Sequence, residues 1–515
     1  MRRGFVLFAG VTSVLAATAL AGCSGGGGQA SSSDTPLKID GAFTLARGSD
    51  VGNLDPQSAY TSNSRQVYAF LYDTLVSVVD GKVRPQLAST WTDSTTNATF
   101  TLKDGVTCSN GAKLTADDVA ANINYVADVK NGSPLAGLAV PVGAKATAAG
   151  NTVTVTTAKP TGFLVQMLAN VPIVCGKGLA DRAMLKQGAD GTGPYTLADV
   201  VPGDHYTFQR RQGYTWGPDG ATTATPGMPA TVTIKIISNA TTLANSLLSG
   251  SVNAGAVIGP DVARLKGAGL FSQSYPGIWG EFLFNQASGR PLGDAALRKG
   301  MAQALDTKQL MTVSTSGEGQ PATTLLGDTP CKADTVTGNV PAYDVTAAKQ
   351  ALAGLSGKTL TFVYSSTTMG KQGAAGSELA VSMWKAAGVN VEVKALPTAE
   401  LFKTVYQTGD WDIVWFPVDG DLPQQVQNTF SGPAAADGGN NFAGIKNPTY
   451  DELSTRAYGQ LGEAGCADWA QADKALVQAA DVVPFSVQTQ AIWGSHATFD
   501  LVFHVVAPTS IRLHQ

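Results

Sequence analysis

The sequence is poor in charged residues and carries no excess of positive charge. Asp, Glu, Lys and Arg make up 14% of the 515 residues, and the formal net charge at pH 7 is −4. Arg2 and Arg3 belong to an N-terminal leader, so the rest of the chain is more acidic still. Proteins that bind nucleic acid neutralise phosphates with clustered basic residues, and no such stripe is present. Nucleic acid is therefore not an expected partner.

Histidine and the common catalytic motifs are also scarce. The four histidines, His205, His496, His504 and His514, show no HExxH or other metal-ligand spacing. No GxxxxGK(S/T) or GxGxxG loop for phosphate stands out. The GxSxG match at residues 22–26 lies in the leader and is not a nucleophile elbow. The sequence predicts no metal site, no cofactor and no enzymatic activity.

The N-terminus has the pattern of an export signal. Met1–Arg3 is positively charged, Gly4–Ala19 is apolar, and Leu20–Cys23 (LAGC) places small residues before a cysteine. A run of Gly, Ser and other polar residues, Ser24–Ser33, follows. An apolar run with a basic start is also compatible with an uncleaved membrane helix. The small residues before the cysteine favour the bacterial lipoprotein signal instead.

A lipoprotein signal defines the mature chain. We expect residues 1–22 to be removed and Cys23 to be acylated, which is strong enough to hold a protein on a membrane. Residues 23–35 then form a flexible Gly/Ser-rich tether. The protein would be extracytoplasmic and lipid-anchored to the outer face of the cell membrane.

Cysteine is rare outside the leader. Four remain, Cys108, Cys175, Cys331 and Cys466, and an even number in an exported chain indicates disulfides with three possible pairings. We predict Cys108–Cys175 and Cys331–Cys466, because each bond then stays within one half of the chain and leaves a hinge free to move. Four buried free thiols are the alternative.

The length of the chain requires two or three domains, because one core does not grow this large. Towards the C-terminus, strands alternate with helices. The expected strands are 359–364, 389–394 and 411–416, and the expected helices are 375–387 and 399–406. This alternation is typical of a parallel βαβ sheet, so the fold class is mixed α/β.

Residues 115–118 (TADD) predict the start of another helix. Thr115 is placed as the N-cap and Asp118 at the third helical position, which is the capping-box pattern. Val119, Ile123 and Val126 then give the helix one apolar face.

The most informative stretch is 411–423 (WDIVWFPVDGDLP). Its first half, Trp411–Phe416, is aromatic and β-branched, as expected of a strand buried on both faces. Asp419 and Asp421 follow on a Pro/Gly loop beyond the carboxyl end of that strand, where open α/β sheets bind ligands. Two acids beside Trp415 suggest a pocket that holds a cation next to apolar surface. The alternative is a surface loop whose acids only keep the chain soluble.

Several motifs occur in a characteristic order along the chain. They are Leu54–Pro56 with Leu71–Leu75, Arg84–Trp91, Thr99–Val106 followed by Leu114–Val119, Gly191–Tyr195, and Phe284-Asn285 with Leu297–Asp306. Each is common alone. Together they resemble the family 5 solute-binding proteins of ABC importers, the dipeptide/oligopeptide-binding class, over nearly the whole mature chain.

The resemblance implies a two-lobed clamshell like that of periplasmic binding proteins, with an inserted subdomain in the first lobe. The implied parts are 36–75 and 179–276 for the core of lobe I, 76–178 for the inserted subdomain, 277–482 for lobe II and 483–515 for a return to lobe I. The two crossings between the lobes would fall near Tyr275–Ile278 and Asp481–Pro484.

The resemblance also implies ligand-binding residues. In peptide-binding members an acid nine residues after the strand acid pairs with the α-ammonium group of the peptide, and counting from Asp412 gives Asp421. The usual Gly-Trp of this loop is replaced by Pro417-Val418. Asp50 falls on a ligand-contacting acid of the first lobe, and Leu135 stands where some members have an aromatic residue. The complete set of expected ligand-binding residues is Asp421, Asp419, Trp415, Asp50, Leu135 and Trp279, although Trp279 and Trp415 are also compatible with core packing.

The implied function is the capture of di- or oligopeptides in the cleft between the lobes and their delivery to an ABC permease and its ATPase, by a monomer. The alternatives are a surface sensor or adhesin, or a binder of another small solute such as a nickel chelate, haem or an oligosaccharide, because this fold alone does not determine the ligand.

Overall fold

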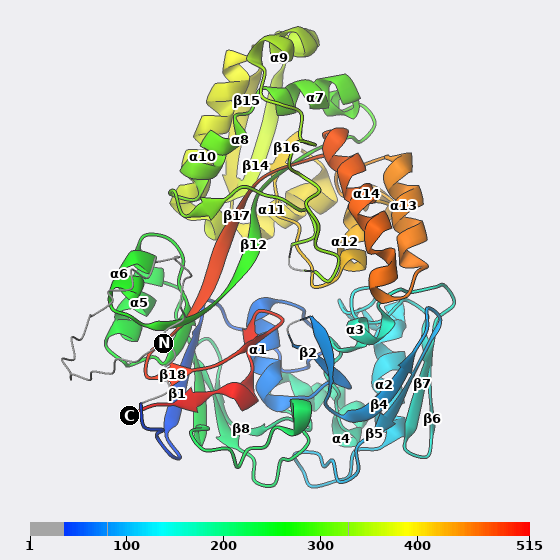
Figure 1. The fold of residues 1–515 in the computed structure, drawn as a ribbon, viewed down its shortest axis with the longest axis vertical. Helices are drawn as coiled ribbons and strands as arrows, with labels where there is room; N and C mark the ends of the chain where they lie inside the picture. The colour runs from blue at the N-terminus through cyan, green and yellow to red at the C-terminus, as the bar shows by residue number, and fades with distance from the viewer. Residues whose placement is uncertain (1–34, 80, 328) are drawn as a thin grey trace, which may run out of the picture. The chain divides into compact units, whose positions relative to one another are not determined.

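One sheet joins strands that lie far apart in the sequence. The computed structural model describes residues 35–79, 81–327 and 329–515, and within them eleven strands form this sheet (Figure 1). The order is β15 (Asn390–Leu396), β14 (Thr359–Ser365), β16 (Ile413–Trp415), β12 (Phe271–Phe284), β17 (Val482–Gly494), β11 (Ala254–Ala256), β1 (Ala42–Arg47), β10 (Thr231–Ile236), β9 (His205–Arg210) and β8 (Tyr195–Val201), with β13 (Gly319–Gln320) also pairing with β17. The predicted leader, Cys23 and most of the predicted tether lie outside the described residues.

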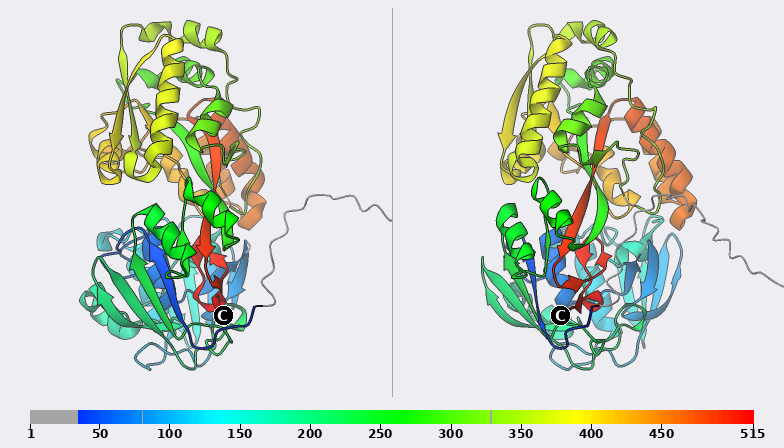
Figure 2. Two further views of the ribbon diagram at one scale, coloured as in Figure 1. Left: turned by 90° about the vertical axis from the view of Figure 1, so that its left-hand side faces the viewer. Right: turned by 60° about the vertical axis from the view of Figure 1, so that its left-hand side comes forward.

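The long strands β12 and β17 form the connection between the two sides of this sheet. They pair antiparallel from Phe271↔Gly494 to Leu283↔Val482 (Figure 2). We call residues 36–270 with 495–515 the first lobe and residues 285–481 the second lobe. The lobe and subdomain limits expected from the sequence stay predictions.

The parallel part of the sheet agrees with the prediction for residues 359–416. β14 is parallel to both β15 and β16, and the helix α10 (Ser366–Ala386) connects β14 to β15. All five residues Trp411–Trp415 are buried. The mixed α/β fold class and the buried character of this strand are therefore confirmed.

The first lobe contains a second, smaller sheet. Its order is β4 (Ala88–Asp93), β5 (Asn97–Leu102), β7 (Thr152–Thr156) and β6 (Lys145–Ala149). Helix α2 (Ala116–Ala127) packs on it, and its predicted capping box is confirmed: the Asp118 amide donates to Thr115 Oγ1 at 3.1 Å, and the Thr115 amide donates to Asp118 Oδ2 at 3.0 Å. The remaining elements of this lobe before β12 are α1 (Ser62–Leu71), β2 (Val76–Val79), β3 (Lys82–Pro85), α3 (Leu164–Leu168), α4 (Gly176–Ala180), α5 (Ala240–Leu248) and α6 (Asp261–Gly267).

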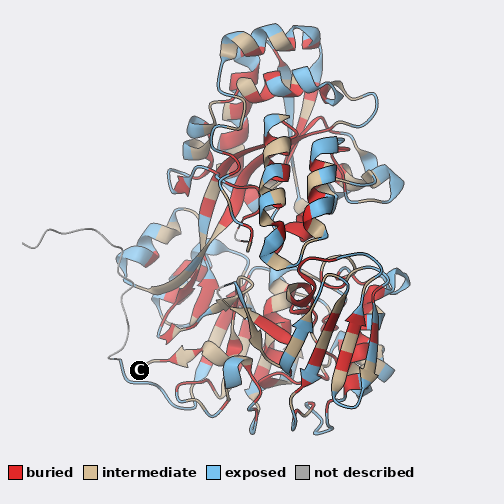
Figure 3. Cartoon of the chain, turned by 45° about the vertical axis from the view of Figure 1, so that its right-hand side comes forward, coloured by how far each residue is buried: buried red, intermediate tan, exposed pale blue. Residues whose placement is uncertain are grey.

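Helices surround the strands of the second lobe, and their buried residues face the sheet and one another (Figure 3). Besides α10 they are α7 (Ala295–Gln303), α8 (Thr307–Ser314), α9 (Val345–Ala351), α11 (Thr398–Lys403), α12 (Pro423–Phe430), α13 (Pro448–Tyr458) and α14 (Cys466–Gln478). In the part of the chain that the structure describes, no helix combines the length and the apolar character that crossing a membrane requires.

The C-terminal segment returns to the first lobe. It forms β18 (Ala497–Thr498), β19 (Leu501–Val502), β20 (Val505–Val506) and β21 (Arg512–Leu513). The side chain of Gln66 in α1 donates to the Val506 carbonyl at 3.1 Å and accepts from the Val506 amide at 2.8 Å. These two bonds attach the β19–β20 hairpin to α1.

Both predicted disulfides are present. Cys108 bonds to Cys175 in the core of the first lobe, and Cys331 bonds to Cys466 at the start of α14 in the second lobe. The alternative of four free thiols is therefore wrong. Because each bond closes within one lobe, each stabilises that lobe, typically by about 2–4 kcal/mol, without linking it to the other.

The two lobes also touch away from the hinge strands. Phe163 and Met167 of the first lobe pack in one apolar cluster with residues of α13 and α14. Beside them the Gly462 amide donates to the Gly162 carbonyl at 2.6 Å. A Cβ atom on Gly162 would lie only 2.2 Å from the Gln460 carbonyl oxygen, so the contact requires glycine.

Candidate ligand-binding site

A salt bridge joins the loop after β16 to helix α1 of the other lobe. Arg65 Nη2 lies 3.2 Å from Asp421 Oδ2, and the Tyr60 hydroxyl donates to the same oxygen at 3.2 Å. The Asp421 side chain is 9% exposed and that of Arg65 is 19% exposed. The acid predicted to hold a cation is thus largely buried and already paired with a cation of its own chain.

Aromatic rings enclose the guanidinium group of Arg65. Its central carbon lies 4.9 Å from the centre of the Tyr60 ring and 5.1 Å from that of Phe503, distances at which a cation is attracted to the face of a ring. Arg65 also donates to Asn170 Oδ1 at 3.4 Å. Burial opposes the charge, but Tyr60 and Asp421 outweigh it and raise the pKa of Arg65.

A buried carboxyl group of the hinge holds the loop that carries Asp421. The Val418 amide donates to Glu281 Oε2 at 2.7 Å, and Glu281 lies on β12 with no exposed surface. Burial raises the pKa of Glu281 to about 8, and the charges of Asp419 and Asp473 add to the effect. Glu281 is therefore mostly protonated at neutral pH. Asp419 itself is exposed, and its Oδ1 accepts from the Gly420 amide at 2.9 Å.

The hinge strand β12 also contributes an aromatic ring, that of Tyr275, to the junction of the lobes. The Tyr275 ring stacks on the imidazole of His504, with ring centres 4.0 Å apart and planes 11° from parallel. Its hydroxyl donates to Gln490 Oε1 of β17 at 3.3 Å. The β19–β20 turn is thereby placed against the hinge.

Charges of both lobes act on Tyr275. Burial raises its pKa, Asp419 raises it further, and Arg47 and Arg65 lower it. Arg47, at the end of β1, donates from Nε to Asn63 Oδ1 at 3.0 Å, and burial lowers its pKa to about 10. Two arginines of the first lobe and two acids of the second therefore lie around the junction of the lobes.

The two predicted tryptophans pack in one buried core cluster, Trp415 from β16 of the second lobe and Trp279 from the hinge strand β12. Trp415 has no exposed surface, packs on Phe282 and Phe485, and donates from Nε1 to the Trp279 carbonyl at 2.7 Å. Trp279 donates from its own Nε1 to the Ser314 carbonyl at 3.0 Å. Packing and hydrogen bonding inside the core explain the positions of both tryptophan rings.

The two remaining predicted residues lie in the first lobe. Asp50 accepts from the amides of Gly203 at 2.6 Å and Gly52 at 3.2 Å and from the Tyr206 hydroxyl. Burial alone would raise the pKa of Asp50, but these donors lower it. Leu135 is buried and lines a cavity together with Tyr60 and Arg65. The structure brings Leu135 close to the Asp421 pair, whereas Asp50 is held by groups of its own lobe.

Tyr60, Arg65, Phe503 and Glu281 are the site residues that sequence reasoning missed. Arg65 lies in α1, and nothing in the local sequence identifies its partner Asp421, which lies more than 350 positions away. Glu281, inside the apolar run that leads to Phe284-Asn285, was the one available signal, because acids are almost never fully buried unless they are paired.

The described residues contain no cluster of three or more His, Cys, Asp or Glu side chains arranged to hold a metal ion.

Comparison with known proteins covers most of the chain. The family model of bacterial extracellular solute-binding proteins, family 5 (middle), matches residues 82–440. The glutathione-binding protein GsiB of Salmonella typhi is 25% identical over 292 residues, which are 54% of this chain and 55% of that protein. The aligned part of the chain thus spans about half the length of that curated relative.

Solved structures match a larger part of this chain than GsiB does. A substrate-binding protein from Microbacterium hydrocarbonoxydans, complexed with 4-hydroxybenzoate hydrazide, is 26% identical with a TM-score of 0.76, covering 92% of this chain and 99% of that one. A dipeptide-binding protein from Pseudoalteromonas sp. SM9913 in complex with Met-Leu is 18% identical with a TM-score of 0.76. The match covers 92% of this chain and 100% of that one.

Proposed function

The chain belongs to the bacterial extracellular solute-binding proteins of family 5, and on that premise we propose that it captures peptides between its lobes and delivers them to the permease and ATPase of an ABC importer. Its fold is the two-lobed α/β fold of periplasmic binding proteins. The role of such a protein is transport rather than catalysis, and we expect it to act as a monomer.

The Arg65–Asp421 pair is the observation that carries the peptide proposal. A buried charge is costly unless it is paired, so each member of the pair needs an opposite charge whenever the other moves away. A short peptide supplies both charges. Its ammonium group takes the place of Arg65 on Asp421, and its carboxylate or a carbonyl group accepts from the released guanidinium.

This exchange also explains how cargo and closure are coupled. A ligand favours the closed state only by binding it better than the open state, which requires contacts to both lobes. Arg65 and Tyr60 come from the first lobe and Asp421 from the second. A ligand bound among them satisfies that condition.

Calorimetry with paired peptides tests the proposal. The protein is freed of co-purified ligand by reversible unfolding and titrated with Ala-Ala, Ala-Ala-Ala and their N-acetylated forms. We expect the free peptides to bind and N-acetylation to weaken binding at least tenfold, because it removes the cation. Equal affinity of free and acetylated peptides contradicts the role of Asp421, and no binding of any peptide contradicts the peptide proposal.

A second candidate is a small aromatic solute. The structure with 26% identity holds 4-hydroxybenzoate hydrazide, and Tyr60 and Phe503 supply aromatic faces at the site in this chain. Mass spectrometry of the ligand extracted from freshly purified protein separates the two candidates.

We also propose that the protein is anchored to the outer face of the membrane through an acylated Cys23. The sequence pattern before Cys23 supports this proposal. Mass spectrometry of the N-terminal peptide from the membrane fraction tests it, and an unmodified Cys23 there contradicts it.

A further inference from the structure

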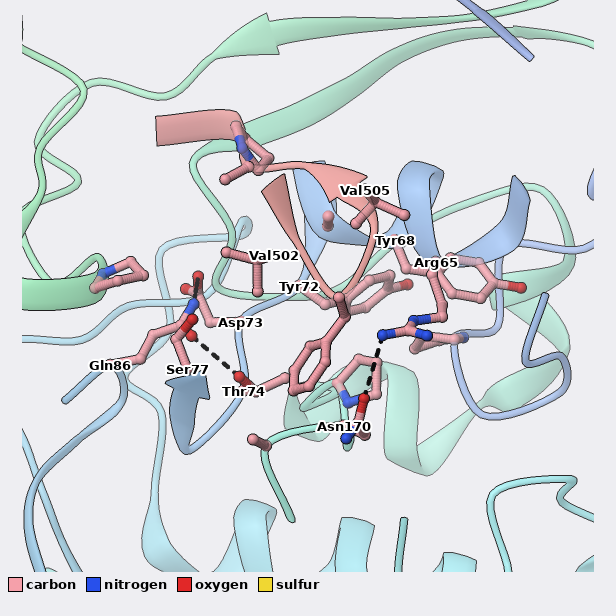
Figure 4. A pocket seen from close by; sticks show the side chains of 18 of the residues that line it. Arg65, Tyr68, Tyr72, Asp73, Thr74, Ser77, Gln86, Asn170, Val502 and Val505 are labelled. Atoms are coloured by element: carbon pink, nitrogen blue, oxygen red, sulfur yellow. Dashed lines mark hydrogen bonds between the residues drawn. The ribbon is translucent and has the colours of Figure 1, made fainter. Parts of the chain in front are cut away.

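A cavity of about 130 Å³ lies in the first lobe, and Arg65 is one of the residues that line it (Figure 4). Every described residue that lines it lies before residue 219 or after residue 501. Helix α1 forms one wall through Arg65 and Tyr68, Tyr72 continues that wall just after the helix, and the β19–β20 hairpin faces it with Val502 and Val505. The cavity is therefore formed by residues of one lobe alone and does not depend on closure of the two lobes.

The rim of the cavity is shared with the charged pair. Arg65 and Tyr60 line the cavity, and the same two side chains contact Asp421. Asn170, which accepts a hydrogen bond from Arg65, lines it as well. If the cationic end of a ligand binds Asp421, a group attached close to that end thus lies at the entrance of the cavity.

The turn that closes the cavity is strained. Phe503 and His504 have φ angles of 48° and 64°, a left-handed conformation that bulky residues rarely adopt. Such strain persists only where surrounding contacts impose it, and it is frequent at ligand sites. Here the contacts of Gln66 with Val506 and the stacking of His504 on Tyr275 hold the turn, and Phe503 lies at the Arg65 end of the cavity.

Size and lining identify the group that the cavity fits. An apolar cavity of about 150 Å³ in another protein binds benzene, and the volume here is close to that. The lining is mostly tyrosine, proline, valine, alanine and Leu135, and the buried Asp73 at the far end is occupied by hydrogen bonds from Tyr214, Trp216 and Thr192. An aromatic ring therefore matches both the size and the polarity.

We propose that this cavity is a subsite for an aromatic ring of the cargo, bound while the cationic group of the same molecule is held at Asp421. The inference rests on the proposed function and adds its substrate class: peptides with an aromatic N-terminal residue. The ring enters between Arg65 and the β19–β20 hairpin, so release of Arg65 from Asp421 opens the way.

Calorimetry with Phe-Ala and Ala-Ala tests the subsite. We expect the wild type to bind Phe-Ala at least tenfold more tightly. Ala69 lines the cavity from α1, so A69L fills it and lowers the affinity ratio of Phe-Ala to Ala-Ala to about three or less. A59L fills it from the loop before α1 and serves if A69L does not fold. A121L, at an exposed position of α2, is the matched control and keeps the wild-type ratio.

The outcomes separate the two proposals. Equal binding of Phe-Ala and Ala-Ala by the wild type, or an unchanged ratio in the filled variants, overturns the subsite and leaves peptide capture intact. Binding of neither dipeptide overturns the proposed function, and this inference with it.

Discussion

Asp421 and Arg65 form a pair of opposite charges at the junction of the lobes, where we propose that the ligand binds. Neither charge is in bulk water, so each depends on the other or on a ligand. We expect D421A to weaken peptide binding at least tenfold, a loss of about 1.4 kcal/mol or more. The reason is that the ammonium group loses its counter-charge while Arg65 remains to repel it.

Calorimetry on the same peptides measures this effect. D437A, which removes an exposed acid from the second lobe, is the matched control and should bind like the wild type. If D421A retains the wild-type affinity, Asp421 is not a ligand contact.

Glu281 provides a test that does not need a ligand. In the unfolded chain its pKa is the ordinary 4.5, whereas in the folded protein burial raises it to about 8. Between these values the folded state keeps a proton that the unfolded state releases, so the free energy of unfolding falls as the pH rises, by roughly 1.4 kcal/mol per pH unit at most. E281Q keeps an uncharged acceptor for the Val418 amide and lacks this slope.

We therefore compare the melting temperature of E281Q with that of the wild type at each pH. The difference, E281Q minus wild type, should be larger at pH 8 than at pH 5. Calorimetric melting at pH 5, 6.5 and 8 measures the difference. E452Q, at an exposed position of α13, is the control and should follow the wild type. Parallel curves for E281Q and the wild type would show that Glu281 does not titrate in this range.

At this scale the sequence predicted one partner of the pair and not the other. Asp421 was recognisable because it follows a buried strand at a fixed distance from Asp412. Arg65, Tyr60 and Phe503 had no such marker, because their roles arise from contacts across more than 350 residues of chain. The sequence predicted that Trp415 lies beside the ligand. In the structure its position is explained by packing in the core, where it contacts Phe282 and Phe485.

At the scale of elements, local signals predicted the structure well where they agreed with packing. The capping box at Thr115 and the alternation over 359–416 are both present in the structure. The strand expected over 411–416 is shorter in the structure, Ile413–Trp415, and just before it the Asp412 carboxylate accepts from the Thr361 amide at 2.8 Å.

The hinge strand β12 shows the limit of local signals. It runs from Phe271 to Phe284 and includes Pro276 and Gly277, which are unfavourable in strands. Pairing with β17 along the whole length imposes the extended conformation there. Tertiary contact, not propensity, decides this element.

Gly162 gives a prediction for the contact between α3 and the helices α13 and α14. G162A places a methyl group against the Gln460 carbonyl oxygen, so the contact must separate. We expect a loss of about 1–3 kcal/mol, the usual cost of overpacking, seen as a lower melting temperature in calorimetry. G267A, in a helix where a methyl group meets open space, is the control and should not destabilise. An unchanged melting temperature for G162A would mean that the lobes do not form this contact in solution.

At the scale of the whole molecule, the salt bridge predicts the ligand-free state. If Arg65 and Asp421 hold the lobes together in the absence of cargo, then R65M should be more open than the wild type. Small-angle X-ray scattering should show a larger radius of gyration for ligand-free R65M. R264M removes an exposed arginine of α6 and is the control. Identical scattering of R65M and the wild type would exclude a closing role of the pair.

The attachment of the C-terminal hairpin to α1 joins the part of the first lobe that is made first to the part that is made last. The bond between Gln66 and Val506 spans 440 residues, and the hairpin it holds closes the cavity of the first lobe. A ribosome makes the chain from its N-terminus, so the lobe begun first is the one completed last. Until residues 501–506 are in place, α1 lacks its cover and Arg65 lacks one of its two aromatic rings, so the cavity and the surroundings of Arg65 form only after those residues have been added to the chain.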